Sequence, residues 1–500
     1  MHAGKQFLID RRSLLTSAAA FSGAVLFGEG RAFAQAAPLL TVDTKTIEVN
    51  KKAAKIFSVK GRGNRVGLVA RAGDRFSGSL LNASAEPLQM HWHGQVNAPA
   101  SQDRARPDGG TLLTGAADVH DFELTSGTHW MHSHSLSEQQ LLAAPMVAVE
   151  KDAGDIQNVI VMLHDFSHRT PQEILAGIGG SSQHSGQGAA HGSGGSSAPP
   201  MSPGVGGHQM PGHSMGGGMM MGRGMGGSGM MGMTHANDVT YDAYLANERT
   251  FDDPEVIEIE AGARVRIRII NGATATAFHI STPGLLSRCI SVDGTSCQPV
   301  TAVAYPLAQG QRIDLVIDVP KKGGMFPLHA QVEAARFVTG LILATRGAPV
   351  RKLGSLAERE TALVDLSLEM QLRAASGLPA KRPNQSFMMM LGEEPGYRWT
   401  INGRVHGEHQ PLKVRHGERV EITFMNPTSM MHPMHLHGHH FQVVGIGGQR
   451  FSGAMRDTII VPAHAPVTVA FDALHKGSWF LHCHHLYHMA TGMMTEVQIA

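Results

Sequence analysis

The sequence has few cysteines, little net charge and no long apolar run beyond its first 34 residues. Only three of the 500 residues are cysteine, and the formal net charge is +1 at pH 7. Removing residues 1–34 takes away four basic and two acidic residues, a charge of +2, and leaves −1. The missing basic excess argues against nucleic acid binding. The missing run of about 20 apolar residues argues against a stable membrane anchor.

The first 34 residues have the features of an export signal. Arg11-Arg12 precedes a weakly apolar run, and Ala32-Phe33-Ala34 is a small-residue cleavage pattern. We therefore predict a twin-arginine signal peptide at residues 1–34 and a protein of the periplasm. An ordinary N-terminal helix is the alternative, but glycine and serine interrupt the run.

Fifty-nine glycines and few aromatic residues favour tight turns and β architecture, and 500 residues are too many for one core. Three segments share a glycine, an arginine two residues later and an asparagine nine residues after the glycine: "AGDRFSGSLLN" (72–82), "AGARVRIRIIN" (261–271) and "HGERVEITFMN" (416–426). A second element places a histidine five residues after a glycine in "GTHWMHSH" (127–134), "GMFPLHAQ" (324–331) and "GSWFLHCH" (477–484). We therefore predict an all-β protein of three consecutive Greek-key β-sandwich domains, at 38–170, 236–350 and 385–500, with a connector at 351–384.

Residues 177–235 are a low-complexity insert rich in glycine, methionine and histidine. Such a composition buries too little apolar area to offset its ordering entropy, so we predict disorder. The part from 201 to 233 holds ten methionines: Met201, Met210, Met215, Met219, Met220, Met221, Met225, Met230, Met231 and Met233. Thioethers prefer Cu(I), which suggests a copper-collecting segment. A flexible linker or an oxidation sink remains open.

Four His-x-His pairs lie at matched places in the first and third repeats. One pair follows the repeated asparagine by nine and eleven residues, and the other lies in the second repeated element: His91/His93, His435/His437, His132/His134 and His482/His484. Residues i and i+2 of a strand point to the same face, so two facing domains can bring eight imidazoles into one space. Imidazole suits copper, zinc, iron and nickel alike.

Cys483 distinguishes the third domain, because it stands between two of these histidines and points to the opposite face. A thiolate, two imidazoles and a weak thioether are the ligands of a blue-copper electron-transfer centre, and the third domain can supply them from His432, Cys483, His488 and Met493. The first domain has Leu88 and Ser133 in two of these places and cannot build such a centre. The second domain keeps only His329, which we interpret as structural.

The motifs "HWHG" (91–94), "HSH" (132–134), "HPMHLHGHHF" (432–441) and "HCHHLYHMATGM" (482–493) resemble the copper motifs of three-domain multicopper oxidases, nearest the bacterial copper-resistance class. The resemblance covers essentially the whole mature chain. It implies cupredoxin-like domains and four copper ions. It assigns type 1 copper to His432, Cys483, His488 and axial Met493, type 2 copper to His91 and His435, one type 3 copper to His93, His132 and His484, and the other to His134, His437 and His482.

The resemblance also implies a mechanism. Electrons from a reducing substrate would reach type 1 copper and pass along Cys483 to the cluster that reduces O₂ to water. An acid near the cluster is expected because the reaction consumes protons. Asp108 resembles the family's acid beside type 2 copper, and Glu138 is a weaker substitute. Met489 stands where a second acid often occurs.

Three functions follow, with O₂ and a small donor as partners and a monomer as the expected state. The first is a cuprous oxidase that confers copper tolerance. The second is a laccase-like oxidase of phenolic or other organic donors. The third is a copper-free structural or cell-division protein of the same fold. Cys289 and Cys297 flank an expected turn at Asp293-Gly294, and either a disulfide or two core thiols remain open.

Overall fold

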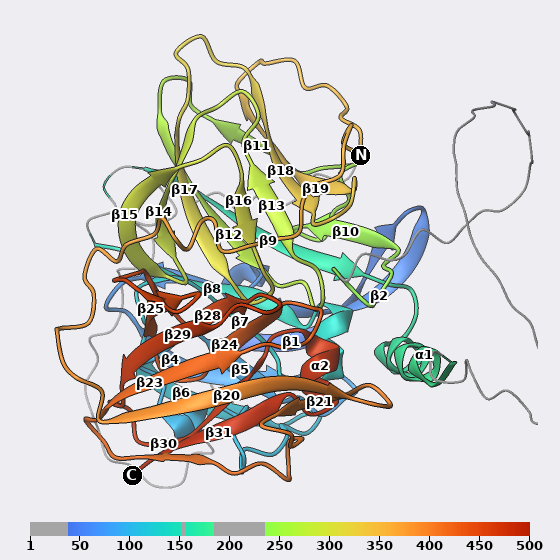
Figure 1. Cartoon of the computed structure of the whole chain (residues 1–500). Helices are drawn as coiled ribbons and strands as arrows, with labels where there is room; N and C mark the ends of the chain where they lie inside the picture. The colour runs from blue at the N-terminus through green and yellow to red at the C-terminus, as the bar shows by residue number, and fades with distance from the viewer. Residues whose placement is uncertain (1–38, 152–153, 155, 185–235) are drawn as a thin grey trace, which may run out of the picture.

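The computed structural model describes residues 39–151, 154, 156–184 and 236–500. The predicted signal peptide and most of the predicted disordered insert lie outside the described residues. Within the described part, six sheets form three β-sandwiches, so the predicted all-β class and the three cupredoxin-like domains are confirmed. In Figure 1 the second sandwich, green and yellow, lies above the first, blue, and the third, orange and red.

The first sandwich consists of two four-stranded sheets around a core that includes Phe76 and Trp92. One sheet has the order β2 (Lys52–Lys60), β1 (Leu40–Val49), β4 (Arg75–Asn82) and β6 (Ala117–Glu123). The other has the order β3 (Leu68–Arg71), β8 (Ala143–Val149), β7 (Gly127–Ser133) and β5 (Met90–His93). Short 3-10 turns occur at Arg62–Asn64, Ala100–Gln102 and Leu136–Gln140.

The second sandwich takes one strand from the range that we assigned to the first domain. Its six-stranded sheet has the order β10 (Ala243–Ala246), β9 (Gln157–Phe166), β12 (Arg264–Asn271), β17 (Arg312–Asp318), β14 (Ser287–Val292) and β15 (Thr295–Thr301). Its five-stranded sheet has the order β11 (Val256–Ile259), β19 (Val338–Thr345), β18 (Met325–Val332), β13 (Phe278–Ser281) and β16 (Tyr305–Leu307). β9 pairs in parallel with β12, so residues 157–166 belong to the sheet of the second sandwich although we predicted them within 38–170.

The third sandwich is the last in the chain. One sheet has the order β21 (Arg398–Ile401), β20 (Gln385–Glu394), β23 (Arg419–Met425), β29 (Val467–Asp472), β25 (Phe441–Ile446) and β26 (Gln449–Arg450), with β27 (Met455–Arg456) on β25. The other has the order β22 (Leu412–Val414), β31 (Met494–Ile499), β30 (Gly477–Cys483), β24 (His432–Leu436) and β28 (Thr458–Val461). The part of the chain that the structure describes has two α-helices, α1 (Pro171–His184) and α2 (Leu486–Ala490). α1 extends eight residues into the range 177–235 that we predicted to be disordered.

The repeated asparagine has the same structural role in all three sandwiches. Asn82 and Asn271 end β4 and β12, Asn426 directly follows β23, and all three are buried. Each side-chain amide donates to two backbone carbonyls, and each side-chain oxygen accepts from the amide two residues later. Because a buried amide needs all these partners, the residue is the same in every copy.

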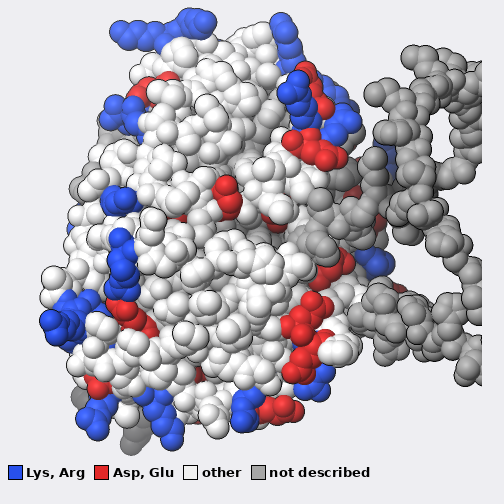
Figure 2. Space-filling view, in the orientation of Figure 1, with Lys and Arg blue, Asp and Glu red and all other residues white. Residues whose placement is uncertain are grey.

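Charged side chains are spread over the surface and also link the sandwiches internally. On the face in Figure 2, basic and acidic residues are interspersed around the edge and the middle is largely uncharged. Arg266 and Arg268 of the second sandwich form buried ion pairs with Glu150 and Asp314. Among the described residues, no helix is long and apolar enough to cross a membrane.

Candidate metal centres

The four His-x-His pairs meet between the first and third sandwiches. Antiparallel pairing sets His91 opposite His132 on β5 and β7, and His435 opposite His482 on β24 and β30. All eight imidazoles are buried. The strand period therefore brings the predicted ligands to one internal space, as the sequence spacing indicated.

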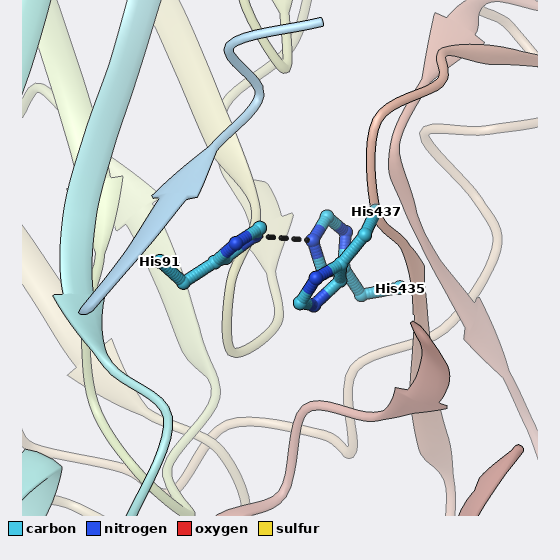
Figure 3. A group of neighbouring side chains, drawn as sticks. All are labelled: His91, His435 and His437. Carbon is cyan, nitrogen blue, oxygen red and sulfur yellow. Dashed lines mark hydrogen bonds between the residues drawn. The ribbon is translucent and has the colours of Figure 1, made fainter. Parts of the chain in front are cut away.

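The ring nitrogens face one another at short distances. The Nε2 atoms of His91 and His435 are 3.2 Å apart, and Figure 3 shows these two rings and His437 reaching toward each other from opposite domains. The Nε2 atom of His482 lies 3.2 Å from that of His134 and 3.0 Å from that of His437.

Three more histidines of the cluster, His93, His132 and His484, also lie close together. Nδ1 of His93 is 3.4 Å from Nε2 of His132, and the ring centroid of His484 is 5.0 Å from that of His132. These contacts bring together each of the three sets that the resemblance assigned to type 2 and type 3 copper.

In four of these rings, the Nδ1 atom points away from the cluster and is hydrogen-bonded to another group of the protein. Nδ1 of His435, His437 and His482 contacts the backbone carbonyls of Asp457, Ala105 and Cys483, respectively. Nδ1 of His91 contacts the Asp103 carboxylate at 2.7 Å. Since these Nδ1 atoms donate, the inward Nε2 atoms carry lone pairs.

Facing lone pairs need a cation between them. Burial lowers the pKa of seven cluster histidines, and that of His482 falls to about 3; the seven are His91, His93, His134, His435, His437, His482 and His484. Neutral nitrogens 3.0–3.2 Å apart repel unless an ion binds both. The donor set therefore fits imidazole-bound metal ions, and copper is among those that imidazole suits.

The second centre lies on the other face of β30. Sγ of Cys483 is 3.6 Å from Nδ1 of His432 and 3.7 Å from Nδ1 of His488, and these two nitrogens are 3.2 Å apart. Burial raises the pKa of the Cys483 thiol, so a bound metal ion is needed to make it a thiolate. Met493 is fully buried, and its carbonyl accepts from the backbone of Cys483. Two imidazoles and one thiolate fit a copper electron-transfer site.

A carboxylate borders this centre on the side away from Cys483. Asp238 lies with its carboxylate oxygens 3.5 Å from Nε2 of His488 and 3.1 Å from Nε2 of His485. The His485 ring stacks on His488 with centroids 3.8 Å apart. The Asp238 side chain is 20% exposed, whereas those of both histidines are at most 2% exposed. Asp238 is therefore the group of this set that reaches solvent.

Asp108 does not lie at the cluster, contrary to our prediction. Its side chain is 85% exposed and pairs with Nε of Arg106 at 2.9 Å. Asp103 occupies the expected place instead, because its Oδ2 atom contacts His91 and its Oδ1 atom accepts from the backbone of Ala105. Both acids stand in the same polar loop, "QDRARPDGG", so local pattern did not distinguish them.

Two further acids contact the cluster. Asp457, which we did not predict, lies with Oδ1 3.1 Å from Nε2 of His93. Its carboxylate also forms a bidentate ion pair with Arg312. Glu138, the weaker candidate from the sequence, is buried with Oε2 3.1 Å from Nδ1 of His132. The only feature of the sequence that could have pointed to Asp457 is that it directly precedes the buried strand Thr458–Val461.

Exchanging each loop acid for its amide separates the two candidates. We expect Asp103→Asn to lower oxygen consumption about 10- to 100-fold, because the carboxylate that orients His91 is lost. Asp108→Asn, the matched control, should leave it unchanged. Steady-state oxygen uptake together with copper content tests this. Equal effects of the two substitutions would contradict the role given to Asp103.

Comparison with known proteins supports this arrangement. Family models described as multicopper oxidase match residues 41–153, 224–346 and 379–500. The chain is 29% identical to multicopper oxidase MmcO of Mycobacterium tuberculosis, over 86% of this chain and 80% of that protein. It is 23% identical to a copper resistance protein A homolog of Pseudomonas syringae, over 92% of each.

Solved structures agree in fold. The laccase from Botrytis aclada superposes with a TM-score of 0.69 at 17% identity, covering 92% of this chain and 86% of that one. A multicopper oxidase from Campylobacter jejuni, described as a metallo-oxidase, gives 0.63 at 18% identity, covering 92% and 90%.

Proposed function

Because the chain belongs to the multicopper oxidase family, we propose that this O₂-reducing oxidoreductase takes its electrons from Cu(I). Copper at the sites described would supply one-electron redox chemistry and storage for the four-electron reduction of O₂ to water. The chain's part is to hold neutral imidazoles inward and to exclude bulk water from eight buried rings. The backbone from His482 through Cys483 to His484 is a bonded path between the two centres.

The observation that carries the proposal is the carboxylate of Asp238 beside His488. The partly exposed negative charge of Asp238 would attract a cation to this edge of the Cys483 centre. Trp399 covers another side of His488, because the two rings stack with centroids 3.9 Å apart. A cuprous ion at Asp238 would lie next to a ligand of the electron-accepting site.

Two further observations support Cu(I). The sequence from Met201 to Met233 is rich in thioethers and ends five residues before Asp238. Relatives from Pseudomonas syringae and Escherichia coli are named for copper resistance, at 23% identity. A laccase-like reaction is the second candidate, because the chain is also 22% identical to a laccase of Thanatephorus cucumeris.

Oxygen uptake with Cu(I) and with a phenol tests the proposal. We expect Asp238→Asn to lower kcat/KM for Cu(I) about 10-fold or more, and more than for the phenol, because only the cation needs the negative charge. Asp242→Asn removes an exposed carboxylate four residues away and should change neither. A wild-type enzyme that turns over the phenol but not Cu(I) would favour the laccase-like reaction.

Deleting residues 201–233 tests the copper-collecting hypothesis separately. We expect a higher KM for Cu(I) and an unchanged KM for the phenol. If Cu(I) turnover is unaffected, the segment does not supply this centre.

We also propose that the protein works in the periplasm after twin-arginine export, and as a monomer. The support is the Arg11-Arg12 pair and the Ala32-Phe33-Ala34 pattern, both outside the described residues. A mature protein beginning at Gln35 would agree with this, and retention of residues 1–34 would not.

A further inference from the structure

A pair of buried cysteines lies outside both centres. Cys289 on β14 and Cys297 on β15 belong to a hairpin whose turn is Asp293-Gly294, as the sequence predicted. Both turn residues have positive φ, 47° and 76°, which is typical of the tight turns that suit hairpins. The rigid turn and the neighbouring strand β17 fix the two cysteines beside each other.

The distance between the sulfurs suits two ligands of one ion. Both cysteines are free thiols in the structure, with Sγ atoms 4.0 Å apart. A disulfide bond is about 2.04 Å long. Metal–thiolate bonds are about 2.3 Å long, so one ion between the sulfurs can bind both with little movement.

A buried cation faces this pair. Arg456 of β27 is 1% exposed, and its positive charge favours ionisation of both thiols, although the contact with Cys297 and burial raise the pKa of Cys289. Its Nη2 atom pairs with Glu369, and its Nη1 atom lies 3.2 Å from Oδ1 of Asp293. Its Nε atom has no hydrogen-bond partner among the described residues.

The two thiols are also arranged to share one proton. The Sγ atoms of Cys289 and Cys297 contact each other, and this contact, aided by Arg456, lowers the pKa of Cys297. The same contact and burial raise the pKa of Cys289. Cys297 is therefore the sulfur that ionises first, with its partner as the donor.

We propose that Cys289 and Cys297 form an additional Cu(I) site in the second sandwich, separate from the histidine cluster between the first and third sandwiches and from the Cys483 centre of the third. Soft thiolates select Cu(I) over harder ions, and a two-sulfur site can hold Cu(I). One Cu(I) replaces the proton between the sulfurs. Binding releases one proton if Cys297 is a thiolate and two if both residues are thiols, and no electron is transferred. The site does not depend on which donor reduces the Cys483 centre.

Copper counting under anaerobic conditions tests the site. The copper-loaded protein is first treated with a phosphine reductant, then given Cu(I) in competition with bicinchoninate, and its copper content is measured. We expect the wild type to retain one more copper per chain than Cys289→Ala/Cys297→Ala. Ser296→Ala, on the exposed side of the same hairpin, should match the wild type. Copper bound at other places, including by methionines, is the same in both proteins and therefore does not contribute to the difference in copper content between the wild type and the double variant.

Two results would overturn the proposal. One is equal copper retention by the wild type and the double variant. The other is an intact mass showing a disulfide that the reductant cannot open in the folded protein. If the double variant fails to fold, two measurements on the wild-type protein test the site. Cu(I) should then protect both thiols from alkylation and add an ultraviolet thiolate-to-Cu(I) absorption, and absence of both effects refutes the site.

Discussion

Cys483→Ser is expected to abolish the blue absorption and donor oxidation while leaving the histidine cluster intact. Serine keeps the size of the side chain, but its hydroxyl is not a soft thiolate and does not supply the strong sulfur ligand of the centre. The eight cluster imidazoles come from the other face of β30 and from β5, β7 and β24, so they keep their geometry. We expect the chain to lose one copper relative to the wild type, and oxygen uptake to fall to background.

Spectroscopy separates this outcome from misfolding. The type 2 copper signal in electron paramagnetic resonance should persist, because His91 and His435 are unchanged. Met489→Leu is the matched control, since Met489 is buried near His488 and the swap conserves volume. It should remain blue. A Cys483→Ser protein that stays blue would refute the role of Cys483.

Asp457→Asn is expected to cause the largest loss of stability. Asp457 is 1% exposed, and its two carboxylate oxygens lie 2.6 Å and 2.5 Å from the guanidinium nitrogens of Arg312, which is itself fully buried. Removing one partner of a buried ion pair leaves the other charge uncompensated and costs about 3–5 kcal/mol. We expect a decrease of that size in the free energy of unfolding of the copper-free protein, measured with urea.

The same substitution should also weaken copper binding at the cluster. The Asp457 carboxylate contacts His93, so it orients a ligand of one predicted copper ion. Loss of such support reduces metal affinity about 10- to 100-fold. Asp121→Asn breaks an exposed pair with Arg75 and should cost about 0–1 kcal/mol. A stable Asp457→Asn protein with four coppers would contradict this role.

The metal ligands were predictable because their arrangement is local. A His-x-His pair on a strand points both rings to one face, and the residue between them points to the other. Thus His482, Cys483 and His484 serve two centres from three consecutive positions. The matched offsets from Asn82 and Asn426 indicated which pairs would face each other, because each asparagine anchors the same turn.

The supporting acids were not predictable in the same way. Asp103 and Asp108 lie in one loop that has no regular strand or helix periodicity. Which of the two carboxylates contacts His91 therefore depends on how that loop packs. Asp238 lies 250 residues before His488 in the chain, and Arg312 belongs to the domain that carries no predicted copper. No spacing rule connects such positions.

By itself the sequence determined the three-sandwich fold and the choice of candidate ligands, because strand period and ligand chemistry are properties of short segments. Only the tertiary structure decided which carboxylates hold those ligands, which ring nitrogen faces inward and where solvent reaches the Cys483 centre. These features depend on burial and on contacts between domains. Asp457 illustrates the difference, since its place beside His93 exists only when the first, second and third sandwiches are packed together.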